Sequence, residues 1–227
     1  LDVRESHKFS FKLLEFRPHW IIHLAAVADL KTSNITDLSV NWLPVETLKY
    51  VQNSLHDCKL VYFSSMLAKE SIAVTPDKVY GHSKFLMEQK CLDTENKNFI
   101  VLRPSTVWGI YHESWINEFV KASKYRYVFK IKNINPKRYF CYVENVSAYI
   151  HELILFGIPE NRKSQVFFLT DPPVKLHDYI NTFTSVVFGY KTLSIPYFFM
   201  YIIAKVGDTL ANLKIRFSLT SFRLSNM

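Results

Sequence analysis

Three short apolar runs restrict the fold of this chain more than any other feature. They are WIIHLAA (20–26), KLVYFSS (59–65) and FIVLRPS (99–105). Each lacks polar alternation, which is typical of strands buried on both faces of a sheet. Apolar residues recur at near-helical spacing between the runs: Leu38, Leu43, Leu48, Val51 and Leu55, then Val79, Phe85, Leu86 and Cys91. This alternation predicts an α/β fold with a doubly wound parallel sheet, which binds ligands beyond the carboxyl ends of its strands.

The pattern loosens after Gly109. We expect helices at 116–123, 146–156, 176–188 and 196–213, and strands at 139–143 and 165–171. Residues 1–109 then form a Rossmann-like core that is incomplete at its N-terminus, and 139–170 return to it. Residues 110–138 and 171–227 form a small, mostly helical lobe.

Glycines are scarce where a nucleotide-binding fold normally needs them. No two of the five glycines are close enough to form the GxGxxG turn that holds a pyrophosphate. Either the fold binds no dinucleotide, or the turn lies upstream of Leu1. Because the chain also starts without Met, we expect a fragment of a longer protein. We expect the isolated chain to bind NAD weakly or not at all.

Tyr80 and Lys84 stand four residues apart in DKVYGHSKFLMEQ (77–89). In a helix this spacing places both side chains on one face. A lysine ammonium one turn away would lower the phenol pKa, so that the tyrosine can exchange a proton near neutral pH. The spacing also arises by chance in a chain with 13 tyrosines. A hydroxyl such as that of Ser65, at a strand end, would hold the reacting oxygen.

Several motifs together resemble a known family. DV (2–3), HLAA (23–26), VYFSS (61–65), YGHSK (80–84), VLRPSTVWG (101–109) and RYFCYVENVSAYI (138–150) occur in its order. They are similar to the extended short-chain dehydrogenase/reductase family, and more narrowly to its NAD-dependent epimerase/dehydratase branch. The resemblance implies an enzyme with Ser65, Tyr80 and Lys84 as catalytic residues. Ser64 is the alternative to Ser65.

The resemblance also implies a cofactor site for NAD, with NADP not excluded. Its residues would be Asp2, Val3, Leu24, Ala25, Ala26, Asn41, Tyr80, Lys84, Ser105 and Val107. Asp2 and Val3 would touch the adenine. Ser65, Thr106 and Arg138 would bind substrate, with Arg138 on a diphosphate and Arg216 as a weaker candidate. His23 is expected to be structural.

The implied function is proton and hydride transfer on a nucleotide-sugar. Relatives commonly continue with Val-Tyr-Gly after the two serines, but this chain has MLAKE (66–70). Because no Asp-Glu pair follows Ser65 directly, epimerase or dehydrogenase chemistry is favoured over dehydration. Two alternatives stay open: a dehydrogenase of a steroid-like or other lipophilic alcohol, and a non-catalytic dinucleotide-binding protein.

The composition limits which classes of ligand and binding partner are expected. The net charge of +8 comes from scattered Lys and Arg without a nucleic-acid motif, which suits a phosphorylated small molecule. Cys58, Cys91 and Cys141 have no metal-ligand spacing and suit reduced thiols in the cytoplasm. IPYFFMYIIA (195–204) is shorter than the ~20 residues that span a bilayer. We therefore expect no metal, no nucleic acid and no membrane contact, and leave a homodimer open.

Overall fold

The chain forms two compact units. The computed structural model describes residues 2–28, 32, 34–68, 76–109, 113–160, 165–212, 219, 221 and 224. Unit 1 contains Leu1–Val107 and Cys141–Asp171, and unit 2 contains Trp108–Phe140 and Pro172–Met227.

Unit 1 is built on a four-stranded sheet. Its strands are β1 (Trp20–His23), β2 (Lys59–Phe63), β3 (Phe99–Pro104) and β8 (Val166–Leu169). They lie in the order β1-β2-β3-β8, and each neighbouring pair is parallel. The four predicted strands and the parallel α/β fold are therefore confirmed. The strands β1, β2 and β3 each end one to three residues before the end of the corresponding apolar run. The last residues of each run therefore lie just beyond the strand, at the carboxyl edge of the sheet.

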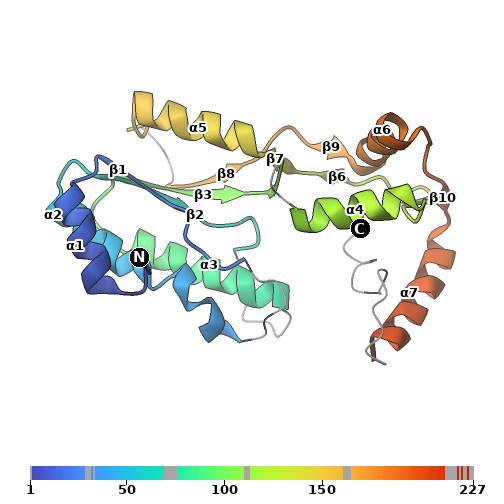
Figure 1. Ribbon diagram of the computed structural model, residues 1–227, viewed down its shortest axis with the longest axis horizontal. Coiled ribbons are helices and arrows are strands. Elements are labelled where there is room, and N and C mark those ends of the chain that lie inside the picture. The colour runs from blue at the N-terminus through green and yellow to red at the C-terminus, as the bar shows by residue number, and fades with distance from the viewer. Residues whose placement is uncertain are drawn as a thin grey trace. The chain divides into compact units, whose positions relative to one another are not determined.

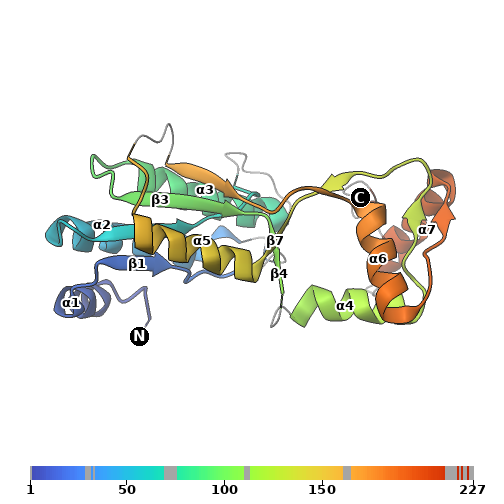
Figure 2. The ribbon, with the colours of Figure 1, turned by 90° about the horizontal axis from the view of Figure 1, so that it is seen from above.

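Helices cover both faces of this sheet (Figures 1 and 2). On one face lie α1 (Ser6–Phe16), α2 (Pro44–Ser54) and α3 (Pro76–Leu92), and on the other lies α5 (Val143–Phe156). A 3₁₀ helix, η1 (Ile35–Asn41), leads into α2. The strands are buried on both sides, which explains their lack of polar alternation.

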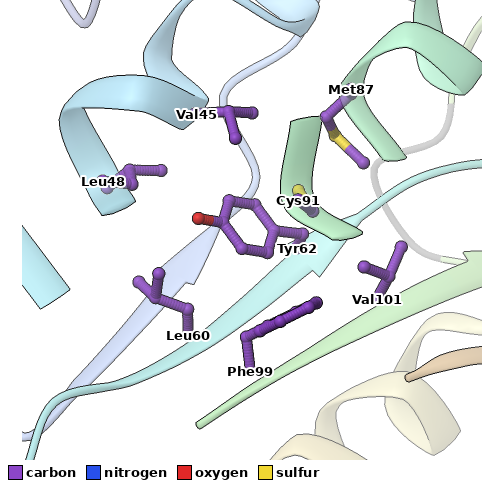
Figure 3. Close-up of a cluster of buried hydrophobic side chains, with 8 residues drawn as sticks. All are labelled: Val45, Leu48, Leu60, Tyr62, Met87, Cys91, Phe99 and Val101. Atoms are coloured by element: carbon purple, nitrogen blue, oxygen red, sulfur yellow. The ribbon is translucent and has the colours of Figure 1, made fainter. Parts of the chain in front are cut away.

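The core on the α2/α3 face is drawn in Figure 3. It contains Val45, Leu48, Leu60, Tyr62, Met87, Cys91, Phe99 and Val101. On the opposite face Val61, Ile100 and Leu102 pack with Leu153 of α5. Full burial of one such aliphatic side chain is worth about 1.5–3 kcal/mol. The two clusters hold the strand ends at fixed positions under the site described below.

Two local features differ from the sequence expectation. The helix α1, which packs on α2 through Phe9 and Leu13, was not predicted. The apolar stripe from Leu38 to Leu55 is split between η1 and α2, because Pro44 begins a new helix where its missing N–H costs nothing. Leu43, at this junction, is 50% exposed and does not belong to the buried stripe.

Unit 2 is mostly helical. It contains α4 (Glu113–Lys124), α6 (Leu176–Phe188) and α7 (Tyr197–Asn212), with β5 (Lys130–Ile131), β6 (Lys137–Arg138), β9 (Val174–Lys175) and β10 (Ser194–Ile195). The strand β5 pairs with β10, and β6 with β9. Two further strands, β4 (Thr106–Trp108) and β7 (Phe140–Tyr142), pair with each other. The helices predicted after Gly109 are confirmed to within three residues at each described end.

Aromatic and apolar side chains hold unit 2 together. The ring of Phe119 on α4 lies 4.9 Å from that of Phe183 on α6. The Phe140 ring stacks on that of Tyr179 at the same distance of 4.9 Å. Met200 and Ala204 of α7 are buried with Ile131. The packing is internal to the unit and makes it a compact body.

Candidate active site

Tyr80 and Ser65 meet at the carboxyl edge of the sheet in unit 1. Ser65 follows β2 by two residues, and Tyr80 lies in the second turn of α3. The Ser65 hydroxyl lies near the Tyr80 phenol and acts on its ionisation. The Ser65 hydroxyl also accepts from the N–H of Leu67 at 3.1 Å, which fixes it at the start of the loop. The structure thus brings together the predicted hydroxyl pair.

The pKa of Tyr80 is raised, because burial disfavours the phenolate, and the neighbouring Ser65 hydroxyl offsets part of that rise. The sequence expectation that Lys84 would lower this pKa is wrong for the structure described. Its ammonium is directed elsewhere and does not contribute to the shift.

Lys84 is buried on the same face of α3, with only 4% of its surface exposed. Its Nζ donates to the carbonyl oxygen of Phe63, the last residue of β2, at 2.9 Å. Burial lowers the pKa of Lys84 to about 8, while Cys91 and Glu88 raise it. The side chain is therefore mostly protonated at neutral pH. An ammonium has three donors, of which Phe63 accepts one.

Hydrogen bonds of the Asn41 side chain connect the loop after β1 to α3. Its amide oxygen accepts from the N–H of Val27 at 2.8 Å, and its Nδ2 donates to the Val27 carbonyl at 3.1 Å and to the Ser83 hydroxyl at 2.9 Å. The Ser83 hydroxyl in turn donates to the Tyr80 carbonyl at 2.7 Å. Asn41 is thus a buried clamp within the candidate cofactor region.

Gly81 allows α3 to approach the loop that carries Ser65. A Cβ atom at Gly81 would lie 2.2 Å from the carbonyl oxygen of Leu67 and 3.1 Å from its carbonyl carbon. Both are backbone atoms, so no side-chain rotation relieves the clash. A residue without a side chain at position 81 is therefore needed for the contact between Ser65 and Tyr80.

Sequence reasoning missed a buried ionic group beside this pair. Glu88, one turn beyond Lys84, is 2% exposed. It accepts from Arg103 Nε at 2.7 Å and from an Arg103 terminal nitrogen at 2.5 Å, and from the Ser64 hydroxyl. The one available signal was the four-residue spacing of Glu88 from Lys84 on the same helix face. Because Ser64 is engaged by Glu88, Ser65 is the serine that faces Tyr80.

The other residues predicted at this edge lie there with different exposure. Leu24, Ala25 and Ala26 follow β1 as an exposed loop. Ser105 follows β3 and is buried, with its hydroxyl donating to Thr170 at 3.3 Å. Thr106 is exposed and Val107 half-buried. These are positions after parallel strands, where this class of sheet binds ligands.

Three predicted residues lie in other parts of the chain. The Asp2 carboxylate is bound by the backbone and guanidinium of Arg4, which hold its pKa at about 2, and Val3 lies beside it before α1. Arg138 lies in β6 of unit 2, opposite Val174. Arg216 lies outside the described residues, as do Lys69 and Glu70 of the MLAKE segment.

His23, expected to be structural, ends β1 and is buried. Burial, with a smaller contribution from the Lys84 charge, lowers its pKa to about 4, so it is neutral at pH 7. Among the described side chains, no group of three or more His, Cys, Asp and Glu is arranged to hold a metal ion. The described helices also include none that is long and apolar enough to cross a membrane.

The sequence was compared with protein-family models. Residues 1–160 match the model of the NAD dependent epimerase/dehydratase family. The chain belongs to this family. The predicted family, its enzymatic character and its use of NAD as cofactor are thereby confirmed. No curated protein matches the chain significantly.

Solved structures with the same fold include several epimerases and reductases. A dTDP-4-dehydrorhamnose reductase from Bacillus anthracis, in complex with NADP, aligns with a TM-score of 0.65 and 18% identity over 86% of this chain and 71% of that one. Helicobacter pylori ADP-L-glycero-D-manno-heptose-6-epimerase gives 0.64 and 20% over 86% and 66%. Bordetella bronchiseptica WbmG, in complex with NAD and UDP, gives 0.64 and 16% over 86% and 65%. At such identities the likeness shows the fold, and this family member spans about two thirds of their length.

Proposed function

We propose that this family member contributes the proton-transfer centre of an NAD(P)-dependent epimerase or dehydrogenase acting on a nucleotide-sugar. The observation that carries the proposal is the proximity of Ser65 and Tyr80, with the buried Lys84 ammonium one helical turn away. These groups lie at the carboxyl edge of a parallel sheet, where the substrate of such a fold is bound.

The pair can hold and deprotonate an alcohol. Ser65 donates a hydrogen bond to the substrate oxygen, and Tyr80, once deprotonated to the phenolate, accepts the proton of the substrate hydroxyl as its carbon is oxidised. In the reverse direction Tyr80 returns the proton. In the structure described the Lys84 ammonium donates to Phe63 and does not act on the Tyr80 pKa, so its proposed role in favouring the phenolate applies to the complex with cofactor and substrate. The nicotinamide cofactor, when bound, accepts and returns the hydride.

The residues at this edge fit the nicotinamide and ribose part of such a cofactor. Lys84 has ammonium donors beyond the one taken by Phe63. Leu24, an apolar side chain that is 62% exposed, follows β1 and offers a surface for a flat ring. Unit 1 is therefore proposed as the cofactor-binding core and unit 2 as the substrate lobe.

The charge distribution supports an anionic substrate on unit 2. Its residues include 13 Lys and Arg but only 4 Asp and Glu, whereas unit 1 has 15 and 16. The entire positive excess thus falls in unit 2, at +9 against −1. Arg138 in β6 is the proposed contact to a sugar diphosphate, because a guanidinium binds phosphate oxygens bidentately.

Nucleotide-sugar chemistry is tested with the protein expressed from its complete reading frame. It is incubated with NAD and, in turn, UDP-, dTDP- and ADP-linked hexoses, and the products are resolved by NMR and by absorbance of the reduced cofactor. An epimer without net cofactor reduction identifies an epimerase, and stoichiometric reduction identifies a dehydrogenase. An unsaturated or deoxy product would contradict the preference drawn from the absence of an Asp-Glu pair after Ser65.

A lipophilic alcohol is the second candidate substrate, favoured by the surface of α7. Phe198, Phe199 and Ile202 on this helix are 65%, 56% and 46% exposed. In the same assay, a sterol or long-chain alcohol dispersed in detergent would be oxidised while the nucleotide-sugars are not. Turnover of neither class, with NAD bound, would favour the non-catalytic alternative.

A further inference from the structure

One face of α3 contacts the last residue of β2 and the two serines that follow it. Tyr80, Lys84 and Glu88 are spaced by four residues and so share a helix face. Tyr80 lies near the Ser65 side chain, Lys84 donates a hydrogen bond to the Phe63 carbonyl, and Glu88 accepts one from the Ser64 hydroxyl. Tyr80 and Lys84, the proposed catalytic groups, are the first two residues of this row on α3. Glu88 is the third, and it has no part in the proton transfer described above.

Glu88 is the residue of this row that also contacts β3. Its two carboxylate oxygens receive both bonds from Arg103, which is near the end of β3. A bidentate guanidinium–carboxylate pair has a fixed geometry, unlike a single contact between flexible chains. Since the carboxylate is almost fully buried, the pair is screened little by solvent. One charged group therefore fixes α3 against the ends of two adjacent strands.

The same carboxylate lies one turn from the Lys84 ammonium. The ionisable groups that interact electrostatically with Lys84 are Cys91 and Glu88 on α3 and His23 on β1. Burial and the carboxylate act on the pKa of Lys84 in opposite directions, burial downward and Glu88 upward. Cys91, which also raises this pKa, is itself a buried thiol whose ionisation is suppressed by burial.

We propose that Glu88 is a positioning residue of the site: with Arg103 and Ser64 it fixes α3 on the strand ends, and it places a buried negative charge one helical turn from the Lys84 ammonium. The proposal rests on the proposed function, since it assigns Glu88 a role through Lys84 and Tyr80. Glu88 touches no reacting atom in this scheme and acts only through its neighbours.

The test measures the ionisation of Lys84 by NMR in the full chain labelled with ¹³C-lysine, with its signal assigned from Lys84→Arg. In Glu88→Gln the side-chain shape and one acceptor remain but the charge is lost. We expect the titration midpoint of Lys84 to fall by about one pH unit, that is, tenfold in its acid dissociation constant. The matched control is Glu46→Gln on α2. This change breaks an exposed ion pair to Lys90 of α3, the helix that carries Lys84, and should leave the titration midpoint of Lys84 unchanged.

A second variant keeps the test decisive if Glu88→Gln does not fold because Arg103 is left without its partner. Glu88→Gln/Arg103→Met removes both buried charges, and buried ion pairs are often replaced by apolar groups at little cost. The Lys84 midpoint is expected to fall by less than in Glu88→Gln, because the loss of the Arg103 cation offsets part of the lost carboxylate charge. An unchanged midpoint in the variants that fold would overturn the proposal and reduce Glu88 to a structural role.

The NMR measurement does not depend on turnover, so it separates this inference from the proposed function. A shifted Lys84 midpoint in a protein that converts no alcohol would refute the enzymatic function and support the Glu88–Lys84 coupling. Normal turnover together with an unshifted Lys84 titration midpoint would support the enzymatic function and refute the coupling between Glu88 and Lys84.

Discussion

At the residue scale, the sequence predicts residues that the structure brings together at the candidate site, but it does not predict their ionisation. The Tyr80–Lys84 spacing and the two serines after an apolar run point to the pair that the structure brings together. The direction of the Tyr80 pKa shift was missed, because it depends on burial and on where the Lys84 ammonium is directed. Neither quantity is encoded in a four-residue spacing.

The two neighbouring serines should separate by experiment. Ser65→Ala removes a hydroxyl from the proposed substrate oxygen, so activity should fall by about 10²-fold or more while stability changes by less than about 1 kcal/mol. Ser64→Ala removes a partner of the buried Glu88 carboxylate and should cost about 1–3 kcal/mol of unfolding free energy. Urea unfolding with parallel rate measurements checks both. The reverse pattern would make Ser64 the catalytic serine.

His23 should make the stability depend on pH. The folded-state pKa of about 4 is below the ordinary value of 6.5, so the folded state binds fewer protons. Its contribution is constant above pH 6.5 and is lost as pH falls toward 4, by about 3 kcal/mol in total. Unfolding free energies of the wild type and of His23→Gln should therefore converge over this range. A parallel decline of the two curves would refute the assignment, and His56→Gln, at an exposed position, serves as the control.

At the element scale, hydrophobic periodicity was sufficient for the sheet and for most helices. The runs at 20–26, 59–65 and 99–105 became β1, β2 and β3 because both of their faces are buried. The helix α1, in which no residue is fully buried, was not predicted although two of its apolar residues, Phe9 and Leu13, lie on one face. The Glu88–Arg103 pair could not be predicted, since it joins a helix and a strand whose register only the fold determines.

Gly81 tests the contact between α3 and the loop after β2. Helix propensity alone predicts that Gly81→Ala stabilises by about 1 kcal/mol. The clash with the Leu67 carbonyl reverses the sign, and we expect a net loss of about 1–3 kcal/mol with reduced activity. Denaturant unfolding measures the difference, with Gln89→Ala at an exposed position of α3 as the control. A more stable Gly81→Ala variant would contradict the close approach.

At the scale of the whole molecule, the two units differ most in charge. The excess of +9 on unit 2 should attract the diphosphate of a nucleotide-sugar and weaken with salt. Calorimetric titration with UDP should show an affinity that falls as NaCl is raised from about 50 to 300 mM. Arg138→Gln should lower it about tenfold further, which is the loss of one charge-assisted contact. Lys132→Gln, an exposed residue of the same unit, should not; equal effects would reduce Arg138 to part of a diffuse charge.

The central claim is that Tyr80 transfers the proton of the substrate alcohol. The most direct measurement is the turnover of a nucleotide-sugar by Tyr80→Phe in the complete protein with saturating NAD. The control is Tyr50→Phe, at an exposed tyrosine of α2. The variant keeps the ring and its packing but has no ionisable group, so kcat should fall by about 10²–10⁴-fold with the fold and NAD binding intact. Undiminished turnover by Tyr80→Phe would contradict the claim.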